Sequence, residues 1–193
     1  SCCLLTGFSS GVVALTNAAF DITGSEFNSR GGTGIKIFGT PALHKIYNNQ
    51  FLECSTGILA NGAAFVTIDY NWFYDSQGNM VGINLSGTGT SFATIKNCIM
   101  VNQSTGIEAS FTGNNIQINN VTISGRQGIK AINCLRNLSI SNSSVRTSHE
   151  GIYIDQHQTS LGLNFGAVTV TNSYVSSIFR SALKVTRLYG NGR

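Results

Sequence analysis

The chain has 193 residues, a length that fits one domain, and we expect residues 1–193 to form a single one. Only 10% of the residues are charged and one is Pro, against 22 Gly, so the composition suits strands joined by many turns. The net charge is +4, but the basic residues form no stripe at the spacing of a nucleic-acid groove, so we expect no nucleic-acid partner. No apolar run is long enough to span a membrane, so we expect no membrane span.

Gly followed by an aliphatic residue recurs along the chain in steps of 22 to 25 residues. Apolar and variable residues alternate after most of these pairs, as in Ile35-Lys36-Ile37, and this period of two predicts a strand. The glycines of this motif after the first, Gly11, are Gly34, Gly57, Gly82, Gly106, Gly128 and Gly151.

A second motif runs in phase with the first. An aliphatic residue is followed two positions later by Asn and five positions later by a large apolar residue, as in Ile46, Asn48 and Phe51. Asn tolerates a left-handed backbone, so we predict a tight turn between two further strands, and stacked Asn side chains can bond to one another as a ladder. The turn residues are Asn48, Asn97, Asn120, Asn142 and Asn172, and Gly24 and Tyr70 take this place in two other copies.

Three short strands in about 23 residues, without a helical pattern between them, describe one turn of a coil. We therefore predict an all-β solenoid of about seven rungs of 22–27 residues, with three parallel sheets and rungs about 4.8 Å apart. One buried stack should contain Ile35, Ile58, Ile83, Ile107, Ile129 and Ile152. The outward column beside it should contain Lys36, Leu59, Asn84, Glu108, Lys130, Tyr153 and Lys184, in which Glu108 and Lys130 can pair.

The third predicted sheet carries an apolar patch on its outer side. It consists of Leu52, Trp72, Tyr74, Ile99 and Val101. Large exposed apolar patches are rare on soluble monomers, so we expect another surface to cover this one. The cover is either the loop Asp75 to Val81, a second subunit, or a sugar that stacks on the aromatic rings. The candidate sugar-binding residues are Tyr70, Trp72, Tyr74 and Tyr153, because amphipathic rings stack on sugars and still offer a polar edge.

Candidate catalytic residues are few. Glycosidases need two carboxylates about 5 to 9.5 Å apart. Glu150 and Asp155 are about 16 Å apart along one strand, and Glu108 and Asp155 are about 12 Å apart on the predicted lattice. His157, in the long segment Gln156 to Gly166, could join Glu150 and Asp155 in acid–base chemistry. The five cysteines lack zinc-type spacing, so we expect no metal and no cofactor.

The motif Gly-Ile-x-Ile, then Ile-x-Asn with an aliphatic residue five positions on, resembles the right-handed parallel β-helix of the pectate-lyase-like superfamily over essentially the whole chain. That superfamily includes polysaccharide lyases, glycoside hydrolases, phage tailspikes and fibres, and bacterial adhesins. The resemblance implies a structural or recognition domain of a tailspike-like or fibre-like virion appendage, as a homotrimer or with other virion proteins, on virions or outside cells. The alternative is a polysaccharide-degrading enzyme, and in either case we expect a fragment or shaft of a longer chain.

Overall fold

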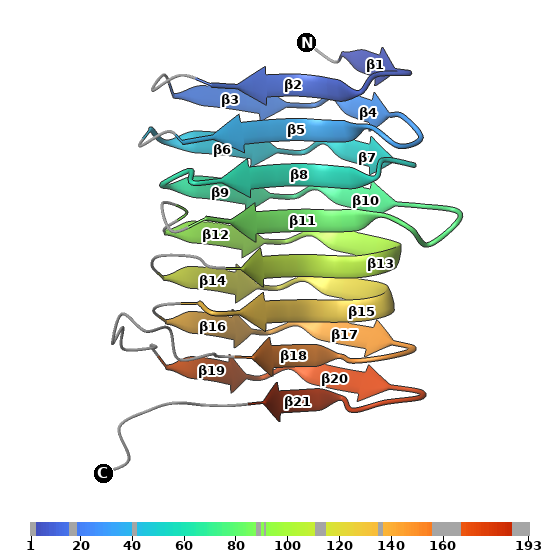
Figure 1. Ribbon diagram of the computed structural model, residues 1–193, viewed down its shortest axis with the longest axis vertical. Coiled ribbons are helices and arrows are strands. Elements are labelled where there is room, and N and C mark those ends of the chain that lie inside the picture. Colours follow the sequence, from blue (N-terminus) through green and yellow to red (C-terminus); the bar gives the residue numbers. More distant parts are fainter. Residues whose placement is uncertain are drawn as a thin grey trace.

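The computed structural model describes residues 3–15, 19–39, 42–87, 90, 92–110, 115–134, 137–155 and 167–186. Every regular element in these ranges is a β-strand, and every pair of neighbouring strands is parallel. The strands stack along one axis as a coil with three faces (Figure 1). The predicted all-β solenoid is therefore confirmed.

The first face contains the Gly-Ile strands, and the second and third faces follow it along each rung. The first face is formed by β2 (Ser10–Ala14), β5 (Thr33–Phe38), β8 (Thr56–Asn61), β11 (Val81–Ser86), β18 (Ile152–Asp155), β21 (Leu183–Thr186) and the second halves of β13 (Ile99–Ser110) and β15 (Thr122–Ile132). The second face is formed by β3 (Phe20–Thr23), β6 (His44–Tyr47), β9 (Val66–Asp69), β12 (Ala93–Lys96), β14 (Ile116–Asn119), β16 (Leu138–Ser141) and β19 (Val168–Thr171). The third face is formed by β1 (Leu4–Thr6), β4 (Glu26–Asn28), β7 (Gln50–Leu52), β10 (Trp72–Tyr74), β17 (Ser144–Thr147), β20 (Tyr174–Ser177) and the first halves of β13 and β15.

The hydrogen-bonded ladders join two of these faces. The second face is a separate 7-stranded sheet, whereas the first and third faces belong to one 14-stranded sheet. The join arises because β13 and β15 continue around the corner from the third face to the first without a break. Three predicted sheets thus correspond to three faces but to two hydrogen-bonded sheets.

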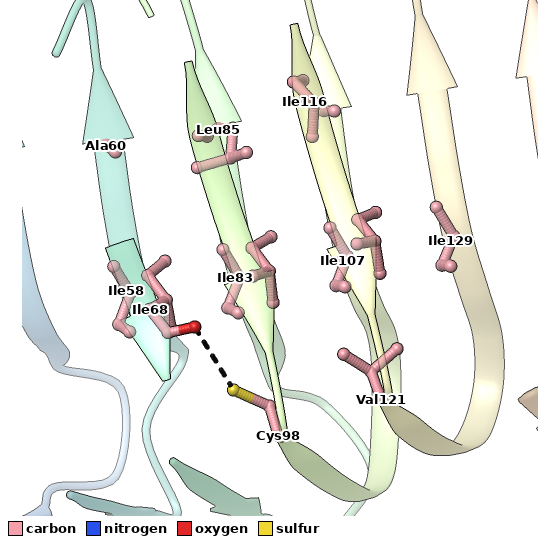
Figure 2. Close-up of a cluster of buried hydrophobic side chains, with 14 of the residues drawn as sticks. Ile58, Ala60, Ile68, Ile83, Leu85, Cys98, Ile107, Ile116, Val121 and Ile129 are labelled. Atoms are coloured by element: carbon pink, nitrogen blue, oxygen red, sulfur yellow. Dashed lines mark hydrogen bonds between the residues drawn. The ribbon is translucent and has the colours of Figure 1, made fainter. Parts of the chain in front are cut away.

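The buried isoleucine stack is confirmed. Ile35, Ile58, Ile83, Ile107, Ile129 and Ile152 pair in register on successive strands, and none is more than 1% exposed. Figure 2 shows four of them in one row across neighbouring strands. On the third face, the Phe27, Phe51 and Phe73 rings stack at 5.0 and 4.8 Å. Aliphatic and aromatic columns therefore fill the coil continuously.

The Asn turns have the expected left-handed backbone. Asn48, Asn97, Asn120, Asn142 and Asn172 have φ values between 47° and 53°, and Tyr70 adopts φ 52° at the equivalent place. Among them, Asn120 Nδ2 donates to Asn97 Oδ1 at 2.8 Å.

A more deeply buried amide ladder lies one residue later in the rung, at a position that the sequence did not single out. Asn71 Oδ1 accepts the backbone N–H of Asn49 at 2.9 Å and its side-chain amide at 3.1 Å. Asn49 Oδ1 in turn accepts the Ser25 N–H at 3.0 Å. These bonds hold the corner between the second and third faces.

Candidate functional site

Exposed aromatic rings gather where the second face meets the third. We call Tyr47, Tyr70, Trp72 and Tyr74 the aromatic corner. The Tyr47 and Tyr70 rings come from adjacent rungs, meet edge-to-face at 5.7 Å, and are 47% and 56% exposed. Trp72 and Tyr74 lie on β10 with ring centroids 5.9 Å apart and an interplanar angle of 22°. The sequence pointed to Tyr70, Trp72 and Tyr74 and missed Tyr47, whose only signal is its outward place at the end of β6.

Polar groups continue the column that contains Tyr47. In register, Tyr47 is followed by Asp69 and then by Lys96 on the next two rungs. Lys96 Nζ lies 3.2 Å from Asp69 Oδ2, and Asn97 Nδ2 donates to Asp69 Oδ1 at 2.8 Å. A row of carboxylate, ammonium and amide groups therefore begins where the aromatic rings end.

The apolar patch of the third face has the predicted register. Trp72 pairs with Ile99, and Tyr74 lies between Leu52 and Val101. Trp72 is 38% exposed and Ile99 is 49% exposed. The predicted interface residues are thus neighbours on one outer surface.

The loop between β10 and β11 does not cover this patch at Trp72 and Ile99. Asp75 is buried at the start of the loop, and its carboxylate accepts the backbone N–H groups of Gln77, Asn79 and Met80 at 3.0, 2.5 and 2.8 Å. Burial raises the pKa of Asp75, but these three hydrogen bonds outweigh burial and the pKa is lowered. The loop closes on its own carboxylate, so two of the three possible covers are left for these side chains: a subunit or a sugar.

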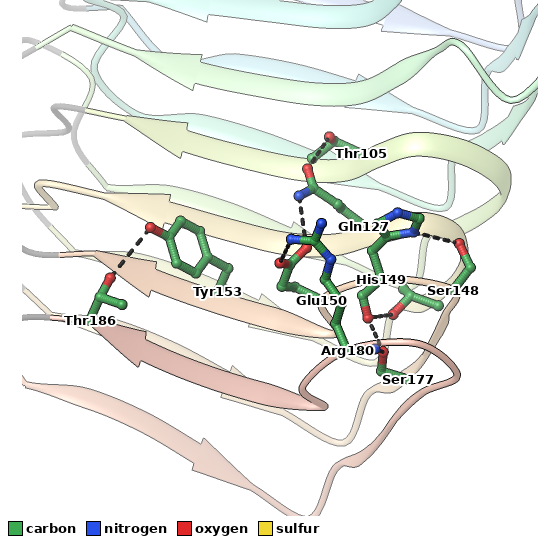
Figure 3. A network of polar contacts seen from close by, with 10 residues as sticks. Thr105, Gln127, Ser148, His149, Glu150, Tyr153, Ser177, Arg180 and Thr186 are labelled. Atoms are coloured by element: carbon green, nitrogen blue, oxygen red, sulfur yellow. Dashed lines mark hydrogen bonds and ion pairs between the residues drawn. The ribbon is translucent and has the colours of Figure 1, made fainter.

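Glu150 lies in a polar network at the corner between the third and first faces (Figure 3). Its side chain is only 6% exposed, and its carboxylate accepts a hydrogen bond from Gln127 Nε2 at 3.1 Å and pairs with Arg180 Nη1 at 3.0 Å. The hydrogen bond from Gln127, opposed by burial and reinforced by Arg180, lowers the pKa of Glu150 to about 2. An ionised carboxylate with both oxygens engaged is poorly suited to act as a general acid.

The other catalytic candidates occupy separate places. Glu108 pairs with Lys130 at 2.9 Å, as predicted. Asp155 is buried at the end of β18 and accepts the Tyr153 hydroxyl at 3.0 Å. Glu108 lies two rungs from Tyr153 in register, so Glu108 and Asp155 remain about 12 Å apart on the strand lattice. His157 lies outside the described residues.

Buried thiols fill structural places. Cys54, Cys98 and Cys134 are at most 2% exposed. Burial raises the pKa of Cys54 to about 11 and that of Cys98 to about 12, which keeps both thiols protonated. Within the described ranges, no three His, Cys, Asp or Glu side chains are grouped to hold a metal, and no helix could cross a membrane.

The comparison with known families identifies the coil. The family described as "Right handed beta helix region" matches residues 2–145 and again residues 56–191. The chain therefore belongs to the right-handed β-helix family, as the repeat pattern predicted. No curated protein gave a significant match.

Proposed function

We propose that this chain is a non-catalytic β-helix segment that binds polysaccharide at its aromatic corner. In this proposal it forms part of an extracellular or virion appendage of the tailspike or fibre kind, within the pectate-lyase-like group that its motifs resemble. We base the recognition function on the aromatic corner, because β-helices have many unrelated functions and the fold does not identify one of them.

The main observation that supports this proposal is the exposure of Tyr47, Tyr70 and Trp72 on adjacent rungs of a rigid coil. The C–H faces of a sugar ring pack on such rings, while phenol and indole edges donate hydrogen bonds to hydroxyls. Asp69, Lys96 and Asn97 add polar partners within the next rungs. A preformed surface of this type loses little conformational entropy when a glycan binds.

The apolar part of the third face supports an assembled state. Ile99 offers no polar edge to a sugar, and it lies beside Trp72 in register. We infer that a second copy of the chain, in a homotrimer, or another appendage protein covers Ile99 and its neighbours. The aromatic corner would then lie at the rim of that interface.

Trp72 is the only tryptophan in the chain, so its fluorescence reports directly on this surface. Titration with bacterial surface polysaccharides should change the Trp72 emission. Tyr70→Asn should weaken binding about fivefold, the equivalent of about 1 kcal/mol for one lost ring contact. This substitution installs the residue that five other rungs carry at the same left-handed turn, so the coil should keep its stability.

Phe92→Asn is the matched control. Phe92 is 46% exposed and also has a left-handed backbone, with φ 55°, but it lies at the corner before β12. Equal weakening by both variants, or an unchanged affinity in Tyr70→Asn, would contradict the aromatic corner as the binding surface.

A further inference from the structure

The charges of this chain are divided unevenly along the coil. Residues 1–110 contain six acidic and four basic residues, whereas residues 111–193 contain two acidic and eight basic ones. The two acidic residues of the second part are Glu150 and Asp155, both buried. The modest net charge of +4 therefore conceals a strongly basic C-terminal part.

Three arginines of this part lie on successive rungs near the corner between the third and first faces. We call Arg126, Arg146 and Arg180 the arginine corner, and all three are exposed. Arg146 pairs in register with Ser124, two residues before Arg126, and the His149 N–H donates to the Arg126 carbonyl at 2.8 Å. On the next rung, the Phe179 N–H donates to the Ser148 carbonyl at 2.9 Å, which places Arg180 beside His149.

The Glu150 carboxylate does not neutralise the arginine corner. Glu150 is buried, and both of its oxygens are engaged, by Gln127 and by Arg180. The Arg180 side chain is still 58% exposed, so its outer side can meet a second anion. The Arg146 guanidinium lies 5.3 Å from the centre of the Tyr174 ring, and that ring is 58% exposed.

We propose that the arginine corner binds anionic groups carried by a polysaccharide, with Tyr174 as a stacking surface for one of its sugars. This inference extends the proposed glycan-binding function to a charged class of ligand. Guanidinium groups match oxyanions with two parallel hydrogen bonds. Rungs repeat about every 4.8 Å. Arg146 lies one rung and two residues from Arg126, about 8 Å on the strand lattice, so anionic groups one to two sugars apart along an extended glycan can meet both guanidinium groups.

Nucleic acid is the less favoured polyanion. The corner presents no helix or two-stranded ribbon that could enter a groove, and single strands are held by series of stacking rings. The exposed rings at this corner are Tyr174, 5.3 Å from the Arg146 guanidinium, and Phe179, which meets His149 edge-to-face and not in a parallel stack.

The test compares ligands with the same backbone. Dextran sulfate should bind and uncharged dextran should not bind at this corner. Arg126→Gln with Arg146→Gln should weaken dextran sulfate binding about tenfold and reduce the salt dependence of the affinity, because two charged contacts are lost. The control pair Lys36→Gln with Lys45→Gln removes the same charge from the N-terminal rungs and should leave the affinity within about twofold, because the screened field of distant charges is weak.

Equal weakening by the two pairs would show that only net charge matters and would overturn the proposal. Tighter binding of duplex DNA than of dextran sulfate, at equal charge and salt, would also overturn it. A fluorescence response of Trp72 to neutral glycans, together with no binding of dextran sulfate, would reject the arginine corner while leaving the aromatic corner supported. Circular dichroism of each variant establishes that the strands are retained.

Discussion

Gly57 shows how one small residue sets the geometry of a rung. A Cβ at this position would lie 2.6 Å from the Gly82 carbonyl oxygen of the next rung and 2.6 Å from the Phe73 ring. Gly34 has the same relation to Gly57 and Phe51. The repeated Gly therefore provides space for a large side chain of the third face to pack beneath the first-face strand.

Gly57→Ala should lower the free energy of unfolding by about 1–3 kcal/mol, because the added methyl overpacks a rigid backbone and a stacked ring. Urea unfolding followed by circular dichroism measures the change. Gly39→Asn is a suitable comparison, since Gly39 has φ 55° and a Cβ added there would meet no other atom within 4 Å. A cost for Gly57→Ala no larger than that of Gly39→Asn would contradict the packing explanation.

Glu150 couples the stability of the C-terminal rungs to pH. Its pKa falls from an ordinary value of 4.5 to about 2 in the folded chain, chiefly because Gln127 donates to it. A group with a lowered folded-state pKa stabilises the fold above its unfolded pKa, and this contribution is lost as the pH falls through the folded pKa. The relevant window is thus pH 4.5 to 2.

Glu150→Gln should flatten the dependence of stability on pH in this window. The native chain should lose stability as the pH falls from 4.5 towards 2, and the variant should lose less. Urea midpoints at several pH values test this. Asp75, whose pKa is also lowered, preserves part of the dependence in the variant. Parallel profiles for the two proteins would refute the role of Glu150.

At the scale of elements, β10 connects the buried core, the aromatic corner and the apolar patch. Phe73 is fully buried, whereas Trp72 and Tyr74 on either side of it point outward. This alternation follows from the two-residue period of a strand. A shift of one residue in β10 would bury the two outward rings and expose the phenylalanine. The Asn49–Asn71 ladder fixes the corner before β10 and so opposes such a shift.

Trp72→Ser with Ile99→Ser should weaken self-association while leaving the coil intact, because both side chains are outward and partly exposed. Light scattering should give a smaller mass for the variant than for the native chain. Thr67→Ser with Thr94→Ser, in register on the second face, is the control and should not change the mass. An unchanged mass in the Trp72 and Ile99 variant would reject the subunit interface.

At the scale of the whole molecule, the coil works as a rigid lattice. Outward side chains are spaced by about 4.8 Å between rungs and about 6.6 Å along a strand. The lattice separates the aromatic corner, between the second and third faces on N-terminal rungs, from the arginine corner, between the third and first faces on C-terminal rungs. It also keeps Glu108, Glu150 and Asp155 in separate local networks.

We therefore predict little or no cleavage of polysaccharide by the isolated chain. A reducing-end assay on bacterial surface polysaccharides should show no more product than a heat-unfolded sample. If cleavage is observed, and Asp155→Asn or Glu150→Gln abolishes it without loss of strand structure, the enzyme interpretation replaces the recognition one.

The sequence by itself determined the coil, the isoleucine stack and the outward columns, because every rung repeats the same alternation and each register is checked by its neighbours. Ile58 could be placed from Ile35 and Ile83 alone. It also determined that Trp72 and Ile99 would be adjacent. Only the tertiary structure decided how Glu150, Gln127 and Arg180 meet, since these residues lie at corners where chain direction does not follow the period. The Asn49–Asn71 ladder also depends on packing between rungs, whereas Tyr47 lies at the end of β6 and had only its outward position as a signal. Side-chain contacts across a corner are set by packing between rungs, whereas the strands and the Asn turns are set by a pattern within each rung.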